Sequence, residues 1–197
     1  QATDQVSLSL VQPADTNFPN AIRNPRVLAK LDHRLTENQT LTLRYRMDRD
    51  TRDNWYIGGT STRERGTDRL IENQDLALSH NWVLSAKALN ELRFQFARRE
   101  LDWSVEDYCP KCPTINRPSI GLGKMINMPQ GRTEDRIQLV ETFSFNVIDK
   151  GGDHFFKVGG DASFIDLESV FHNNLDGAFT FATDKPFNVN DRSTYPT

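Results

Sequence analysis

The feature that most constrains the fold is an alternation of apolar and polar side chains in two runs that flank one short polar turn. In the second run, apolar residues occupy every other position, at Leu41, Leu43, Tyr45 and Met47. The first run, residues 27–32, alternates in the same way, and turn-forming residues lie between the two runs. A period of two fits a β-strand and cannot place one apolar face on a helix. Residues 24–50 are therefore predicted to form a β-hairpin.

The same pattern predicts two more hairpins farther along the chain. Residues 69–82 and 88–103 form the strands of one, and the other runs from residue 137 to residue 164 through a glycine-containing turn. Weaker strands are expected at residues 5–11 and 177–183. The sequence thus predicts an all-β fold of antiparallel hairpins, with about seven or eight strands in a single segment that covers residues 1–197.

Two long polar stretches separate the hairpins. Residues 51–68 and 104–132 show no periodicity and are predicted to be long loops. A regular alternation of short turns and long loops is typical of outer-membrane β-barrels, whose turns are short at the periplasmic rim and long outside. We therefore expect part of a barrel in the bacterial outer membrane, with short turns on one rim, long loops on the other and membrane lipid as a partner.

Composition is consistent with this expectation and narrows the list of partners. The mean hydropathy is −0.63 and no apolar run approaches twenty residues, which excludes a transmembrane helix, whereas alternating barrel strands average to a polar value. Hydrophobic residues make up 37% of the chain, a low fraction for a soluble protein with a packed core. Charges of both signs are scattered to a net −3, so nucleic acid is not an expected partner.

Two observations leave an alternative open. The apolar residues from Leu76 to Trp82 span only about 14 Å of membrane normal, against an apolar band of about 25 Å. His80 and Glu141 also fall on the face predicted to meet lipid. The alternative is a soluble or surface-assembled β-sheet protein, a subunit or filament component without a transport role, whose open sheet edges are closed by neighbours.

Three phrases carry a resemblance to a known family: LAKLDHRLTENQTLTLRYR, ALNELRFQFARRE and HFFKVGGD. They resemble the barrel region of TonB-dependent outer-membrane receptors, in particular the Oar-like group. The resemblance implies a barrel of about 22 strands plugged by an N-terminal domain. It also implies binding or transport of a large substrate, either peptide, protein or glycan, with energy passed through an inner-membrane complex. Because no plug-domain sequence is visible, we expect the chain to be a fragment that pairs with the remainder of the barrel or with neighbouring subunits.

Cys109 and Cys112 form the most specific local motif of the sequence, Cys-Pro-Lys-Cys. The spacing occurs in thiol oxidoreductases, but Pro113 follows at once and no βαβ pattern surrounds it. A loop disulfide is the favoured interpretation, with an inert dithiol and a redox motif as alternatives. A zinc site needs two more ligands, for which only His154 and His172 lie downstream.

Four aromatic residues lie in or beside the two long loops: Trp55, Tyr56, Trp103 and Tyr108. Exposed rings on loops serve as binding platforms for carbohydrate or peptide, and the alternatives are an interfacial girdle or packing within the loops. No nucleophile elbow, phosphate loop or metal-ligand spacing occurs in the sequence. We therefore predict no catalytic residue, no cofactor and no metal, and expect a protein that is not an enzyme.

Overall fold

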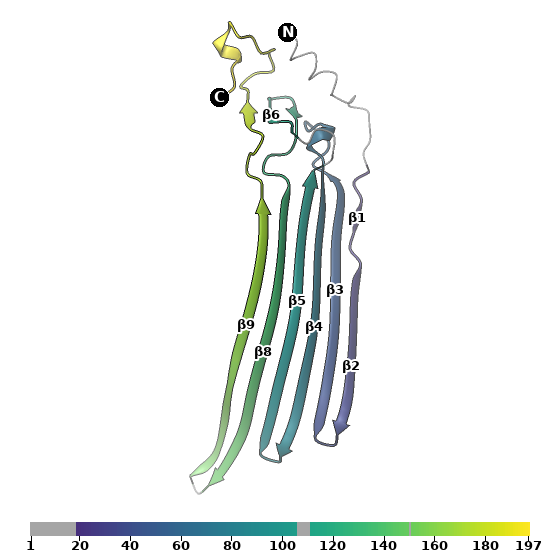
Figure 1. The fold of residues 1–197 in the computed structure, drawn as a ribbon, viewed down its shortest axis with the longest axis vertical. Helices are drawn as coiled ribbons and strands as arrows, with labels where there is room; N and C mark the ends of the chain where they lie inside the picture. Colours follow the sequence, from purple (N-terminus) through teal and green to yellow (C-terminus); the bar gives the residue numbers. More distant parts are fainter. Residues whose placement is uncertain (1–18, 106–110, 150) are drawn as a thin grey trace.

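The computed structural model describes residues 19–105, 111–149 and 151–197, and most of them lie in one long, curved, single-layer β-sheet (Figure 1). The sheet consists of β1 (Ile22–Arg23), β2 (Arg26–Thr36), β3 (Gln39–Trp55), β4 (Thr67–Ser85), β5 (Ala88–Val105), β8 (Gln130–Asp149) and β9 (Gly152–Phe171). Every neighbouring pair in it is antiparallel. The predicted all-β fold of antiparallel hairpins is confirmed.

The three predicted hairpins are β2–β3, β4–β5 and β8–β9, each with two residues between its strands. Their strands are longer than expected at the loop side, because β3 continues to Trp55 and β4 already begins at Thr67. The predicted loop 51–68 is therefore shortened to residues 56–66. Residues 49–53 are polar on both faces of β3, so the apolar alternation ends while the strand itself continues.

The hairpins are staggered relative to one another. Gln39, the first residue of β3, pairs with Trp82, three residues before β4 ends at Ser85. Ala88, the first residue of β5, pairs with Phe145, four residues before β8 ends at Asp149. Figure 1 shows the result as turns that step downward from β2–β3 to β8–β9. A stagger of three to four residues in the same direction is what tilted strands in a barrel wall require.

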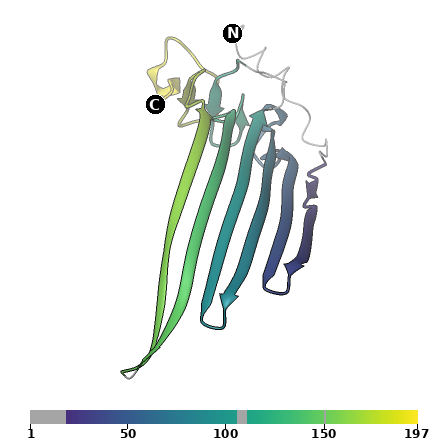
Figure 2. The ribbon, with the colours of Figure 1, turned by 60° about the horizontal axis from the view of Figure 1, so that its bottom comes forward.

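The sheet is open: β9 forms one edge, β1 and β2 form the other, and the described residues do not close it into a ring (Figure 2). At one edge, β1 and β2 both pair with β3 and form one broken strand, interrupted at Asn24 and Pro25. At the other edge lies β9, which is exposed along its whole length, as β2 is. Each edge thus presents backbone groups to a further strand.

A second, smaller structure lies at the loop ends of the long strands. We call residues 56–66, 111–129 and 172–197 the cap. It contains a three-stranded sheet of β6 (Thr114–Asn116), β7 (Gly121–Leu122) and β10 (Ala178–Thr180), and the 3-10 turns η1 (Arg63–Arg65) and η2 (Arg192–Thr194). Within the described ranges, no helix is long and apolar enough to cross a membrane.

The predicted strand at residues 177–183 is shorter than expected and belongs to the cap. It is β10, which pairs with β6 in parallel and so lies outside the antiparallel hairpins. Three residues of pairing are too few for a periodic sequence pattern to reveal. The predicted strand at residues 5–11 lies outside the described residues.

Burial is concentrated in the cap and its junction with the sheet. Among the described residues, Met128 is the one buried large apolar side chain, at 5% exposure. The remaining buried side chains are polar or charged, and they are Glu64, Arg65, Thr67, Thr114, Lys124 and Thr194. The large sheet instead exposes its leucines and phenylalanines. A sheet of this kind has no protein core of its own, and its apolar face needs an apolar environment outside the chain.

Candidate functional site

Three of the four predicted loop aromatics meet where the long strands join the cap. Trp55 ends β3, Tyr56 follows it, and Trp103 lies near the end of β5. The ring centroids of Trp55 lie 4.6 Å from Tyr56 and 5.3 Å from Trp103, and the three planes are tilted by 12° to 16° from one another. Near-parallel rings at these distances attract one another. We call these three residues the aromatic stack.

The start of β4 holds the aromatic stack in place. The indole N–H of Trp103 donates to the hydroxyl of Thr67 over 3.0 Å, and Thr67 is fully buried. Thr67 is also the register partner of Trp55, after a bulge that follows Arg52. At that bulge, Asn54 has a φ of 55° and donates its backbone N–H to Asp68 over 2.9 Å. The bulge turns the end of β3, so that Trp55 lies beside Trp103.

Two arginines cover one member of the aromatic stack. The guanidinium carbons of Arg52 and Arg69 lie 5.0 Å and 4.8 Å from the ring centroid of Trp55, within the range of a cation–π interaction. Arg69 also donates to Asp50 over 2.7 Å, which fixes its position. Tyr56 is 37% exposed. The arrangement presents a partly exposed aromatic surface next to positive charge.

Arg65 joins two of the three segments of the cap, residues 56–66 and 111–129. Its guanidinium donates to the carbonyl of Ile115 over 2.8 Å and to the side-chain oxygen of Asn116 over 2.7 Å. Burial lowers the pKa of Arg65 from its ordinary value. A Cβ atom on Gly121 would lie 2.5 Å from the Arg65 guanidinium carbon. Gly121 lies in β7, and its lack of a side chain makes room for Arg65.

The remaining predicted site residues are only partly described. Tyr108 and Cys109 lie outside the described residues, whereas Cys112 lies in the cap. The disulfide between Cys109 and Cys112 stays a prediction. Arg65, Thr67 and the two arginines beside Trp55 were not predicted from the sequence. The spacing Arg52-x-x-Trp55 in the sequence is compatible with the contact between these two side chains. The contacts of Arg65 and Thr67 instead depend on pairings between distant segments, which no local pattern shows.

The two faces of the long sheet differ sharply in polarity. One row of register partners crosses five strands as Leu43, Leu78, Phe94, Leu139 and Ala162. The adjacent row on the opposite face is Arg44, Ala77, Gln95, Gln138 and Ser163. On β8 the apolar face extends from Ile137 to Val147, which at about 3.3 Å per residue and a tilt of about 45° spans about 23 Å. This length matches the apolar band of a membrane barrel, which the segment Leu76–Trp82 alone does not.

A family model described as an outer membrane beta barrel domain matches residues 5–194. The chain belongs to this family. No curated protein and no solved structure matches the chain. The barrel domain lies in the bacterial outer membrane, with lipid against the face of Leu78 and Leu139, and the opposite face lines the barrel interior.

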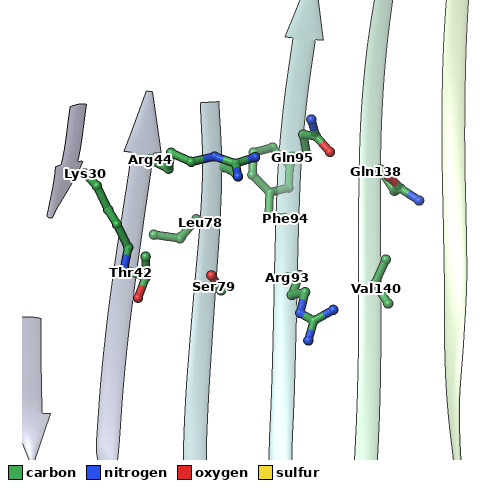
Figure 3. Close-up of a pocket in the computed structure, with 11 residues that line it drawn as sticks. Lys30, Thr42, Arg44, Leu78, Ser79, Arg93, Phe94, Gln95, Gln138 and Val140 are labelled. Carbon is green, nitrogen blue, oxygen red and sulfur yellow. The ribbon is translucent and has the colours of Figure 1, made fainter. Parts of the chain in front are cut away.

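The interior face of the barrel domain carries a shallow hollow at mid-sheet. Its floor is made of small residues that include Ala77 and Ser79, and Lys30, Arg44 and Arg93 surround it. Figure 3 shows the Arg44 side chain extending from β3 across β4, and the Arg93 side chain extending from β5 toward β8. None of the described residues that line the hollow is a carboxylate, but Thr42 and Gln138 donate hydrogen bonds to Asp32 and Asp161 at its margin. The positive groups of the hollow are those of Lys30, Arg44 and Arg93.

Both polar residues expected on the lipid face are found there, and each has a polar partner. The ring of His80 lies 3.1 Å from the side-chain oxygen of Gln39, and Asn90 donates its side-chain amide to Glu141 over 3.1 Å. Each partner belongs to an adjacent strand of the sheet. A polar contact between neighbouring strands reduces the cost of exposing these groups to lipid.

Proposed function

We propose that the barrel domain is part of a TonB-dependent receptor-like protein that binds a large substrate at its loop-side rim and passes it across the outer membrane. The observation that carries this proposal is the aromatic stack, because a preformed, partly exposed aromatic surface held by the start of β4 suits the capture of a ligand. The phrases that resemble the Oar-like receptors support the energised, TonB-dependent form. We propose binding and passage rather than catalysis.

The substrate class follows from the chemistry of the rim. Tyr56 and its neighbours offer ring faces, and Arg52, Arg69 and Asp50 offer charged and hydrogen-bonding groups beside them. Glycans and peptides both present apolar patches next to polar groups, which this combination can contact. We therefore keep peptide, protein and glycan as the proposed substrate classes, with Tyr108 as a further proposed contact.

The exposed edges at β2 and β9 support the proposal that this chain is a segment of a larger barrel. Two free edges with unpaired backbone groups are costly in a membrane, so we propose that the remainder of the barrel or a neighbouring subunit pairs with them. The soluble or surface-assembled alternative is disfavoured because the family match and the 23 Å apolar face agree on a membrane wall.

Binding at the rim is tested with purified full-length protein and defined panels of oligosaccharides and peptides. We expect at least one panel member to change the intrinsic tryptophan fluorescence, and a Tyr56→Ala variant to bind it on the order of tenfold more weakly. Tyr195→Ala is the matched control, because it removes a tyrosine of the cap outside the aromatic stack. Equal binding by the parent and Tyr56→Ala would reject the aromatic stack as the binding surface.

The TonB-dependent step needs a separate test. In living cells, chemical cross-linking should join the full-length protein to the energy-transducing TonB protein of the inner membrane. Deletion of that TonB protein should abolish uptake of the ligand found above, while binding to purified protein stays unchanged. Uptake that persists at its full rate in the deletion strain would reject energised transport and leave the binding role intact.

A further inference from the structure

The interior wall of the barrel domain carries charges of both signs, and in its ion pairs the two signs lie at different depths. Four arginines on this face pair with carboxylates, namely Arg44 with Asp75, Arg46 with Asp48, Arg93 with Glu91 and Arg136 with Glu134. In three of these pairs the arginine is 50% to 58% exposed, whereas the carboxylate is 16% to 23% exposed. In the fourth the values are 46% and 31%. The carboxylates thus lie against the sheet and the guanidinium groups lie above them.

This layering follows from the sequence and the register. Three of the pairs join residues two apart on one strand, which places both side chains on the same face. The longer arginine side chain then reaches past the shorter carboxylate toward the barrel interior. A guanidinium carries five N–H donors, and Arg93 contacts Glu91 through one nitrogen, so it keeps donors for a second anion.

At the mid-sheet hollow, exposed guanidinium groups lie around a floor of small side chains. Arg44 and Arg93 flank Ser79 and Ala77, and Gln95 lies beside them, as Figure 3 shows for the labelled residues. Exposed ion pairs contribute little net stability, so an incoming anion displaces such a carboxylate contact at small cost. Arginine also suits planar or tetrahedral oxyanions, because its donors match two oxygens at once.

We propose that this hollow binds anionic solutes inside the barrel, through Arg44 and Arg93, and that it selects groups such as carboxylate, sulfate and phosphate. The site lies on the interior wall, apart from the aromatic stack at the rim, and it does not depend on how transport is energised. Lys30 contributes positive charge at its margin, where it pairs with Asp32 over 2.9 Å. The chemistry recognised is that of a small oxyanion.

The test places a cysteine in the floor of the hollow, as Ser79→Cys, in the full-length protein within outer membranes. Two methanethiosulfonate reagents of similar size, one anionic and one cationic, report the local charge through their labelling rates, with the unsubstituted protein as background. We expect the ratio of the anionic to the cationic labelling rate to be higher for the introduced thiol than for a free thiol in solution. Adding Arg44→Gln and Arg93→Gln should reduce that preference on the order of tenfold.

Arg98→Gln is the matched control, because Arg98 also pairs with a carboxylate, Asp135 at 3.6 Å, but lies on the opposite face of the sheet. This control should keep the preference for the anionic reagent. Citrate should slow labelling in the Ser79→Cys protein and in the control, and not in the Arg44→Gln and Arg93→Gln variant.

Three results would overturn the proposal. Equal rates with both reagents would show that the hollow is not cationic. Absence of labelling with either reagent would show that another part of the protein fills it, so no solute reaches it. An equal loss of preference in the Arg98→Gln control would assign the effect to overall charge and remove Arg44 and Arg93 from the site.

Discussion

The long sheet and the cap distribute polar and apolar residues in opposite ways. In the sheet, large apolar side chains are exposed, as at Val158 (62%) and Phe164 (68%), and the bilayer covers them. In the cap, charged and hydroxyl side chains are buried, with Arg65 and Lys124 below a tenth exposed. The cap is therefore stabilised by specific polar contacts, whereas the sheet relies on backbone pairing and on lipid. A substitution is expected to act through different physics in the two regions.

The largest expected effect is a charge placed on the lipid face. Leu78→Arg puts a guanidinium among Leu43 and Phe94, at a depth where an arginine costs about 2–4 kcal/mol in a barrel wall. Asn81→Arg on the interior face is the matched control, because the new guanidinium lies opposite the carboxylate of its register partner, Glu91. Folding into bilayers, followed by urea titration, measures both. Equal losses in the two variants would remove the distinction between the faces.

A smaller effect is expected in the cap. Arg65→Gln removes charged hydrogen bonds to Ile115 and Asn116, which are worth on the order of 2 kcal/mol together. Hydrogen exchange should accelerate at residues 114–122 and stay unchanged in β4 and β5. Arg117→Gln, which loses one exposed hydrogen bond to Lys185 and a cation–π contact with Phe181, is the control and should change exchange less. Faster exchange throughout the sheet would show that the two regions are not independent.

The same contrast explains what the sequence predicted and what it did not. The hairpins were predictable because a period of two repeats through Leu41 to Met47 and again through Ile137 to Val147. The positions of the aromatic residues beside the long loops were visible in the sequence, but of the three described rings Tyr56 is exposed, whereas Trp55 and Trp103 are half-buried. Arg65 and the parallel contact of β10 with β6 were not, because both depend on residues about fifty or more positions apart. Neither leaves a periodic pattern in the sequence.

The predicted disulfide includes Cys112 of the cap, and its removal is expected to have a smaller effect than the substitutions above. Replacing Cys109 and Cys112 by serine should lower the free energy of unfolding by less than about 1.5 kcal/mol, because the closed ring contains only two intervening residues. Titration of the unfolded, unreduced protein should find no free thiol. Two free thiols would reject the disulfide and restore the redox and inert-dithiol alternatives.

The smallest expected effect is a pH dependence at η2. The hydroxyl and the backbone N–H of Ser193 both donate to Asp191 and lower the pKa of that carboxyl below its ordinary value of 3.8. A lowered pKa in the folded state means that this contribution is complete above pH 3.8 and is lost as the pH falls through the folded-state pKa. The protection of the Ser193 amide, measured as its exchange rate relative to the intrinsic rate at each pH, should therefore fall in acid. An equal loss of protection in Asp191→Asn would contradict this assignment.

The central claim, that the sheet is a membrane wall with lipid on one face and the barrel interior on the other, is tested most directly by spin labels placed one at a time at residues 137–145 of β8. Collision with oxygen, which concentrates in lipid, and with a water-soluble nickel chelate gives the environment of each label. The account predicts a period of two, with odd positions such as Leu139 and Phe143 favouring oxygen and even positions such as Gln138 and Thr142 favouring nickel. Equal accessibility at odd and even positions would contradict it.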